Sequence, residues 1–297
     1  MREGRDNAVS RLRENAAQLY LTDSDRLPAS AQKWEQNARR LAEHILRDEP
    51  SQFCSWDVIR ETMFASNIGH ARTELAYLQK KIDWNKGWKR SLVESRVGAP
   101  ERYVGYRKSS TNLIHHCYHL AVFQEVTARS VPSFDCVIEF GGGYGSMCRL
   151  ISNLAFQGRY IICDLPIFSA LQEYYLSSLN LTVRRPRRGD ALNAGISLLS
   201  DVAHLSSLMS DLRDSKTLFI ATWSLSEIPL AARKEISEVA RNSSAFLIAY
   251  QKDFMEIDNS LFFESWREKS SSGKSIVNFE IEHMPGNYYF IGVDEKG

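Results

Sequence analysis

Hydrophobic positions in the first part of the chain recur with the period of an α-helix. Residues 29–46, for example, read ASAQKWEQNARRLAEHIL, and their apolar side chains fall on one face with charged side chains opposite. No segment before residue 130 has the alternation or the β-rich run of a strand. The pattern therefore predicts that residues 1–125 form a separate helical region ahead of a second domain at 126–297.

After residue 126, short apolar runs alternate with helical patterns. We expect strands near 135–140, 159–163, 181–185, 217–223 and 245–250. Helices fit between them near 144–156, 166–179 and 230–242. Such a βαβ series predicts an α/β fold, a mostly parallel Rossmann-like sheet with helices on both faces. The end of the chain differs, because two strand-like segments flank Pro285-Gly286 and predict an antiparallel hairpin.

Composition narrows the class of protein. With 43% hydrophobic and 25% charged residues, and 37 basic against 36 acidic side chains, the chain reads as a globular protein without a net field for nucleic acid or anionic membranes. No apolar run reaches the roughly 18–20 residues of a membrane span, and the first residues lack a signal-peptide core. The five cysteines have no metal-binding spacing. We expect a cytoplasmic protein with reduced cysteines and no metal site.

A glycine-rich stretch, VIEFGGGYG at 137–145, carries the strongest chemical signal. The dinucleotide pattern GxGxxG fits Gly141 and Gly143, but its third position falls on Ser146. The pattern E-x-G-x-G-x-G, which begins at Glu139, fits throughout and is typical of enzymes that bind S-adenosylmethionine (SAM). Bare main chain lets such a cofactor lie close to the loop, and the acid helps to hold its amino-acid end.

Acidic residues after the next two predicted strands fit a nucleoside. Asp164 ends the second strand, where a carboxylate can accept hydrogen bonds from two ribose hydroxyls. Asp190 follows the third and is a candidate for the adenine amino group, although Gly189-Asp190 can also simply form a turn. Tyr106 or Arg107, just before a predicted helix, is expected to reach the cofactor carboxylate. The complete set that we assign to the cofactor is Glu139, Gly141, Gly142, Gly143, Asp164, Leu165, Asp190, Ala191, Trp223, Tyr106 and Arg107.

Four stretches resemble the class I SAM-dependent methyltransferases, and most narrowly the sugar O-methyltransferases of bacterial polysaccharide clusters. They are YRKSSTNLIHHCYHL, VIEFGGGYGSMCRL, YIICDLPIFSALQEYYL and TWSLSEIP. The resemblance covers about residues 103–293. It implies a seven-stranded sheet that closes with an antiparallel hairpin, and SAM as cofactor. The sequence DLP before a helix is also seen in enzymes that methylate phenols.

Methyl transfer to an alcohol needs a group that removes a proton. Glu227 follows the fourth predicted strand at the ligand-binding edge, and is our first candidate for a base or acceptor-orienting group. The alternative is that it caps a helix beginning near Pro229. His283, late in the sixth predicted strand, is the second candidate base. Trp223 is expected to wall the site and stack on a sugar.

Two further patterns have ordinary explanations as well as functional ones. His115 and His119 share a helix face at i, i+4 spacing, which could hold a metal, but we favour a packed or surface pair. The basic run RRPRR at 184–188 suits a solvated loop, and would favour a phosphorylated acceptor only if it bordered the pocket.

The sequence thus predicts a SAM-dependent O-methyltransferase acting on a hydroxyl of a sugar or sugar-containing small molecule. Residues 1–125 would cap the acceptor pocket and form a homodimer contact. The alternatives are an O-methyltransferase of a phenolic or other natural product, a non-catalytic nucleotide-binding module, and an NAD-dependent oxidoreductase, which Ser146 and the closing hairpin disfavour.

Overall fold

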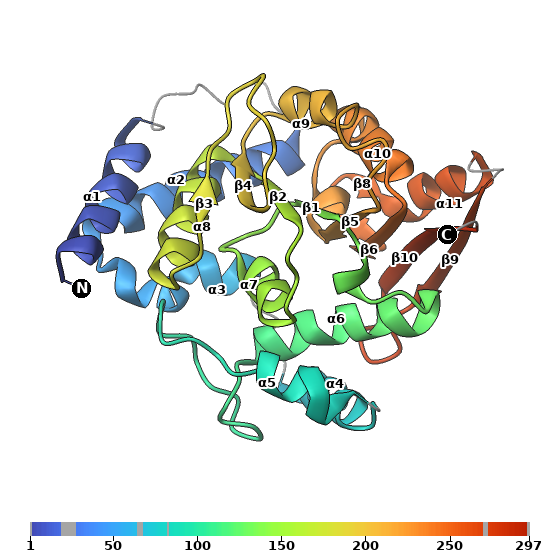
Figure 1. Cartoon of the computed structure of the whole chain (residues 1–297), viewed down its shortest axis with the longest axis horizontal. Helices are drawn as coiled ribbons and strands as arrows, with labels where there is room; N and C mark the ends of the chain where they lie inside the picture. Colours follow the sequence, from blue (N-terminus) through green and yellow to red (C-terminus); the bar gives the residue numbers. More distant parts are fainter. Residues whose placement is uncertain (1, 19–27, 64–67, 82, 270–272, 296–297) are drawn as a thin grey trace.

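The computed structural model describes residues 2–18, 28–63, 68–81, 83–269 and 273–295 (Figure 1). Within these ranges no helix combines the length and the apolar character needed to cross a membrane.

An eight-stranded sheet runs through the centre of the molecule. Its strands, in spatial order, are β3 (Val183–Arg184), β4 (Gly195–Leu199), β2 (Arg159–Cys163), β1 (Cys136–Phe140), β5 (Thr217–Thr222), β6 (Ala245–Gln251), β10 (Asn287–Asp294) and β9 (Lys274–Glu280). The strands from β3 to β6 are parallel, whereas β10 is antiparallel to both of its neighbours. The predicted α/β fold with a closing hairpin is confirmed.

The predicted third strand is wrong in position. Only β3 forms within 181–185, as a two-residue edge strand, and the third long strand is β4, which lies outside every strand expected from the sequence. Arg184 and Arg185 are exposed, so this segment pairs only as a short strand at the sheet edge, whereas the apolar run of β4 is buried in the sheet. The sheet therefore has eight strands rather than seven.

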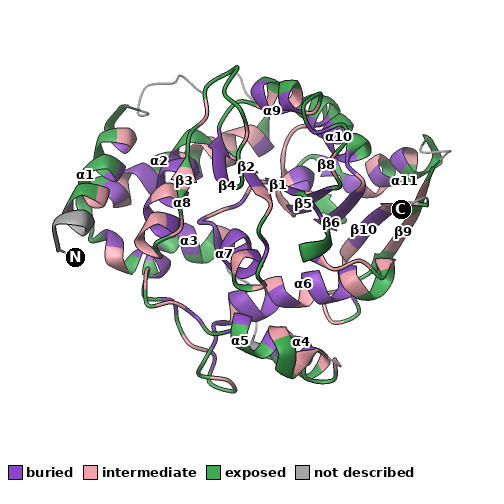
Figure 2. Cartoon of the chain, in the orientation of Figure 1, coloured by how far each residue is buried: buried purple, intermediate pink, exposed green. Residues whose placement is uncertain are grey.

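Helices cover both faces of the sheet (Figure 1). They are α1 (Arg2–Gln18), α2 (Ala29–Arg47), α3 (Asp57–Met63), α4 (Ile68–Gln79), α5 (Lys89–Ser91), α6 (Thr111–Thr127), α7 (Ser146–Asn153), α8 (Pro166–Ser178), α9 (Val202–Leu208), α10 (Arg233–Asn242) and α11 (Asn259–Lys269). Alternate residues of β1 enter two apolar clusters: Val137 joins α1, α2, α6, α7 and α8, whereas Ile138 joins α9, α10 and α11. Figure 2 shows the central strands buried between these layers.

Buried polar contacts fix the N-terminal region against the sheet domain. Arg149 of α7 donates to Glu94, at 2.8 Å, and Glu94 also accepts from the Ser110 hydroxyl at 2.5 Å. Ser110 in turn caps α6 by accepting from the Leu113 amide. This chain of contacts ties α6, whose second turn lies beside the candidate site, to α7, which begins at the glycine loop.

Candidate active site

A cavity of about 1210 Å³ opens at the carboxyl ends of β1, β2, β4 and β5. Ligands of open α/β sheets bind at this edge. Helices α2 and α3 and the start of α6 contribute to its walls. Small-molecule pockets are typically about 300–1,000 Å³, so the cavity is large enough for a cofactor and an acceptor together.

Gly141, Gly142 and Gly143 lie in the cavity wall, and local geometry explains why glycine is needed there. Gly141 and Gly143 have left-handed backbone angles, with φ of 73° and 58°. A Cβ on Gly141 would overlap the Cβ of Ser224, and one on Gly142 would lie 2.6 Å from the Ile162 side chain. The loop is therefore bare main chain on the cavity side and closely packed behind.

Asp164 lies in the cavity wall and holds the glycine loop in shape. Its Oδ2 accepts from the Gly143 amide at 3.0 Å and from the Gln172 side chain at 2.8 Å, and its Oδ1 accepts from the Leu165 amide at 2.7 Å. A carboxylate has about four acceptor positions. At most one remains for a ribose hydroxyl, rather than the two that the sequence suggested. Leu165 itself lies at the cavity rim, 41% exposed.

Three carboxyl groups in the cavity wall have raised pKa values. Burial raises the pKa of Glu139 to about 8, against the lowering effect of a 2.8 Å hydrogen bond from the Tyr160 hydroxyl. Burial likewise raises the pKa of Asp164 to about 7, and that of Glu227 to about 7. A cation bound among them would stabilise the ionised forms.

Glu227 and Trp223 stand on the segment after β5, as predicted, and both line the cavity. The Glu227 carboxylate accepts from Gln251 at 3.1 Å and from Trp34. Glu227 does not cap a following helix, because neither the 3₁₀ turn Leu230–Ala232 after Pro229 nor α10, which begins at Arg233, has a side-chain cap. Trp223 has a φ of 64°, which is unusual for a bulky residue and marks a strained position at the site.

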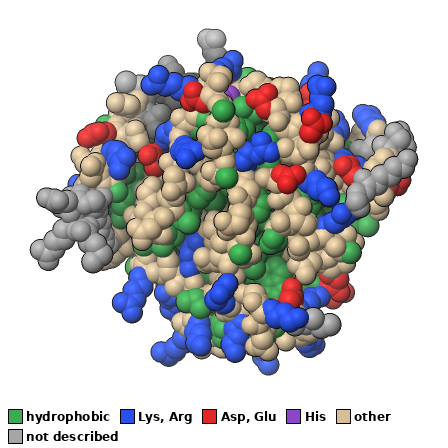
Figure 3. Space-filling model, viewed as in Figure 1, with side chains coloured by type: hydrophobic (Ala, Val, Ile, Leu, Met, Phe, Trp, Pro, Cys, Tyr) green, Lys and Arg blue, Asp and Glu red, His purple; other side chains and the backbone are tan. Residues whose placement is uncertain are grey.

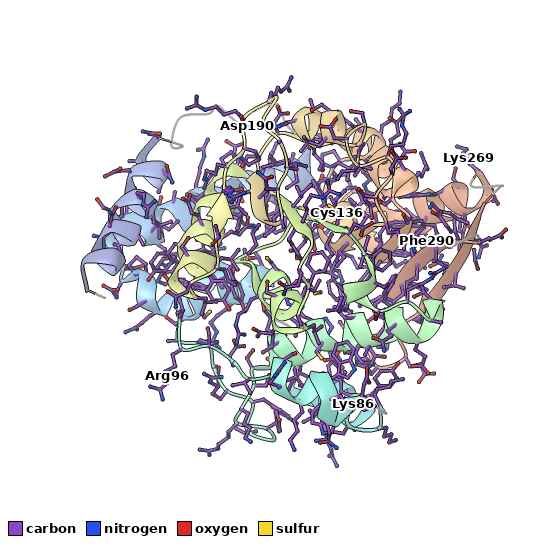
Figure 4. The ribbon with its side chains drawn as sticks, in the orientation of Figure 1. Lys86, Arg96, Cys136, Asp190, Lys269 and Phe290 are labelled. Atoms are coloured by element: carbon purple, nitrogen blue, oxygen red, sulfur yellow. The ribbon has the colours of Figure 1, made fainter. Side chains whose placement is uncertain are left out.

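Asp190 and Ala191 are absent from the described cavity lining. Both are exposed, and the Asp190 carboxylate accepts from the Arg187 amide within its own turn. Figure 4 shows Asp190 on a loop at the top of the view, away from Cys136 in the sheet. The prediction failed because it took 181–185 as the third long strand; β4 is that strand, and Ser200 beyond it lines the cavity.

The basic run at 184–188 also lies outside the cavity lining. Arg185 pairs with Glu173 and Arg188 pairs with Asp201, each at 2.7 Å. These pairs support the ordinary reading of the run as a solvated loop.

Tyr106, Arg107 and His283 are absent from the described cavity lining. Arg107 is exposed, and Tyr106 packs against Trp84 in the loop before α6. His283 lies beyond the end of β9, in the turn before β10, and contacts Glu74 at 2.9 Å. The structure thus places all three outside the described lining of this cavity.

Other cavity residues were missed by the sequence analysis. They are Trp34 of α2, Met63 of α3, and Asn112 and His116 of α6. These residues lie on helices in a part of the sequence without strands, so no pattern indicated that their side chains reach the edge of the sheet. Of the two histidines considered for a metal, His115 lines the cavity and His119 is buried behind it. In the described ranges, no three His, Cys, Asp or Glu side chains are grouped to hold a metal ion.

Comparison with known proteins gives loose structural likenesses. No family model and no curated protein matches the sequence. The solved structure of PigF with SAH aligns over 99% of this chain and 97% of its own, at 15% identity and a TM-score of 0.39. Precorrin-6y C5,15-methyltransferase from Geobacter metallireducens GS-15 aligns over 53% and 78%, at 14% identity and 0.35.

A fibrillarin/Nop5p complex aligns over 64% of this chain and 85% of its own, at 12% identity and a TM-score of 0.42. Because these likenesses are loose, the assignment of the fold rests on the strand order and directions in the sheet itself.

Proposed function

We propose that this protein is a SAM-dependent O-methyltransferase that acts on a hydroxyl of a sugar or sugar-containing small molecule. The observation that carries the proposal is the convergence, in one cavity, of the glycine loop and the Asp164 and Glu139 carboxyl groups. When bound, SAM would supply an electrophilic methyl group. A non-catalytic module would not need the further cavity volume beside that cradle.

The charges of the cavity fit this cofactor. Of the described lining residues, six are acidic (Glu35, Glu61, Glu139, Asp164, Glu227 and Glu235), whereas Arg39 alone is a Lys or Arg, and it pairs with Glu35. Besides its carboxylate, SAM carries two cationic groups, a sulfonium and an ammonium, which suit buried acids. The pyrophosphate of NAD would meet these acids unfavourably.

The same charges favour a neutral acceptor over a phosphorylated one. Trp34 and Trp223 provide flat apolar surfaces for a sugar ring, and Glu227 provides an acceptor for its hydroxyl groups. Figure 3 shows acidic and basic side chains interspersed over the upper part of the visible face, with Lys and Arg more numerous along its lower edge.

A phenolic acceptor is the second candidate. Ile228, Pro229, Ile236 and Met284 make part of the cavity wall apolar, which suits an aromatic ring as well as a sugar face. The homodimer contact through the N-terminal helices and the domain boundary at residue 125 stay predictions.

Calorimetry and product analysis test the proposal. We expect S-adenosylhomocysteine (SAH) to bind and NAD to give no heat. With SAM present, a panel of nucleoside-free sugars and simple phenols should yield a methyl ether of a sugar, detected by mass spectrometry. Binding of NAD alone would overturn the cofactor; methylation of phenols only would select the second candidate; SAH binding without any methylation would favour the non-catalytic module.

Replacing Asp164 with alanine should weaken SAH binding by about 1–3 kcal/mol, the scale of a lost charged hydrogen bond. The carboxylate acts on the cofactor chiefly through the Gly143 amide that it holds. Isothermal calorimetry measures the change. Asp190→Ala is the matched control, because that acid is exposed and outside the cavity, and it should bind SAH as the wild type does. Equal affinities for the two variants would remove Asp164 from the site.

Glu227→Gln should leave SAH affinity unchanged and lower turnover of the acceptor by about 10- to 100-fold, since it weakens one charged hydrogen bond to the hydroxyl. The glutamine keeps the shape of the side chain and its contact with Gln251. Steady-state kinetics with SAM and an acceptor that the wild type methylates measures turnover, and calorimetry with SAH measures cofactor affinity. A variant with full turnover would show that Glu227 does not contact the acceptor.

A further inference from the structure

A buried histidine–glutamate pair lies beside the cavity. Glu74 of α4 is 1% exposed and His115 of α6 is 3% exposed. The Nδ1 of His115 is 2.5 Å from Oε1 of Glu74, and the Nε2 of His283 is 2.9 Å from the same oxygen. The carboxylate is thus held between two imidazole rings, one of which reaches the cavity wall.

The second ring nitrogen of His115, Nε2, has no hydrogen-bond partner among the described residues. His115 lines the cavity and its ring stacks on that of Trp223, with centroids 5.2 Å apart and planes 27° from parallel. Trp223 follows β5, at the edge where a ligand would bind.

This geometry selects the basic tautomer of the ring. A carboxylate can only accept, so Nδ1 of His115 must donate its proton to Glu74, which leaves a lone pair on Nε2. A carboxylate that orients a histidine in this way also stabilises the imidazolium that forms when the ring takes up a proton. We propose that His115 is the general base that removes the acceptor's hydroxyl proton, and that Glu74 positions it.

The inference rests on the proposed function and completes its chemistry. The proton of the acceptor O–H passes to Nε2 of His115, while the oxygen forms a bond to the methyl carbon and the bond from that carbon to sulfur breaks. The products are a methyl ether, the thioether SAH and an imidazolium, whose proton is then released to solvent. Glu227, on the segment after β5, orients the hydroxyl in this scheme.

Of the titratable groups around His115, Glu74 is the charged one and the neighbouring histidines are neutral. Burial by itself would raise the pKa of Glu74, but His115 and His283 outweigh it and lower that pKa to about 2. From its own helix, His115 is faced by His116 and His119. Burial lowers the pKa of His116 to about 3 and that of His119 well below its usual value.

The remaining neighbours come from two other elements. From α4, His70 contacts His283, and burial lowers the pKa of His70 as well. From β10, the Tyr289 hydroxyl lies 2.5 Å from Nδ1 of His119. Among the described residues, the carboxylate of Glu74 is therefore the one anionic group in direct contact with the His115 ring.

Kinetics of His115→Asn tests the base. Asparagine keeps a donor toward Glu74 but has no basic nitrogen, so kcat should fall by about 10²- to 10⁴-fold, the contribution of a general base, while the Kd for SAH stays within about twofold. His204→Asn is the matched control, because His204 is a buried histidine of α9 outside the described cavity lining, and its kcat should not change. Retention of kcat by His115→Asn would overturn the proposal.

Variants of Glu74 test the positioning role. In Glu74→Gln the imidazolium of His115 loses its counter-charge. In a plot of kcat against pH, the acidic limb should therefore move to lower pH, and the maximal kcat should fall. Glu74→Asp keeps the charge and should restore the limb toward its wild-type position. A packing role alone would not move the limb, and an unchanged profile in Glu74→Gln would exclude Glu74 as the positioning residue.

Nuclear magnetic resonance of protein labelled with ¹⁵N-histidine shows which ring nitrogen of His115 carries the proton, and it does not depend on turnover. The two-bond correlation of His115, identified by its loss in His115→Asn, should show a protonated Nδ1 and an unprotonated Nε2. A protonated Nε2 at neutral pH would overturn the inference. If the wild type binds no SAH, the proposed function fails; if it binds SAH and methylates an acceptor but His115→Asn does so equally well, only this inference fails.

Discussion

Gly141→Ala should destabilise the protein by about 2–5 kcal/mol and abolish measurable SAH binding. A left-handed backbone costs a residue with a Cβ roughly 1–2 kcal/mol, and Gly141 has a φ of 73°. Its Cβ would also overlap the Cβ of Ser224, and overpacking costs typically about 1–3 kcal/mol more. The strain falls on the turn that forms the cavity floor. Urea denaturation measures the loss of stability.

Gly189→Ala separates the two contributions. Gly189 also has a left-handed backbone, with a φ of 91°, but a Cβ there would have no atom within 4 Å. That variant should therefore lose only the backbone share, about 1–2 kcal/mol. The double variant Gly141→Ala/Ser224→Gly removes the overlapping atom and should recover the packing share. If Gly141→Ala were no less stable than Gly189→Ala, the contact with Ser224 would not explain the glycine.

Local patterns predicted the parts of the site that depend on one strand and the loop after it. The E-x-G-x-G-x-G loop placed Glu139, Gly141 and Gly143 in the cavity wall, since the alternating glycines coincide with left-handed backbone positions. Asp164 follows β2 directly and was placed for the same reason. Such residues need only the strand and the edge to which it points.

Residues that depend on register or on distant contacts could not be predicted. Asp190 was misplaced because residues 181–185 were taken as the third long strand. Only two of them form the edge strand β3, and the strand that pairs with β2 is β4. Glu74 and His115 are 41 positions apart and meet only when α4 packs against α6. Helical periodicity says which face is buried, but not which polar groups meet there.

Binding of SAM should tighten as pH rises, because the cavity carboxyls must lose protons to pair with its cations. The pKa values of Glu139, Asp164 and Glu227 in the protein alone are about 8, 7 and 7, all raised chiefly by burial. Between about pH 5 and 8 a bound cation would therefore release protons, and each one released changes affinity by up to about tenfold per pH unit. We expect the Kd for SAM to fall at least 10-fold from pH 6 to 8.

Two comparisons make this prediction specific to the sulfonium and to these carboxyls. SAH lacks the sulfonium charge, so its Kd should fall less than that of SAM over the same pH range. The Kd for SAM divided by the Kd for SAH should therefore decrease as pH rises. Calorimetry in buffers of different ionisation enthalpy counts the protons directly. Glu139→Gln should release fewer protons, whereas Asp190→Asn, outside the described cavity lining, should match the wild type. A pH-independent Kd for SAM would mean that the cations do not lie among these acids.

The same carboxyls also link stability to pH in the free protein, and the sign is opposite. An acid with a raised pKa in the fold binds its proton more tightly than in the unfolded chain, so the folded state holds more protons between about pH 4 and 8, and stability falls as pH rises through that window. SAM should offset this loss, since it binds best where the carboxyls are ionised. The rise in melting temperature on adding SAM should therefore be larger at pH 8 than at pH 6, whereas a ligand that merely filled the cavity would give the same rise at both.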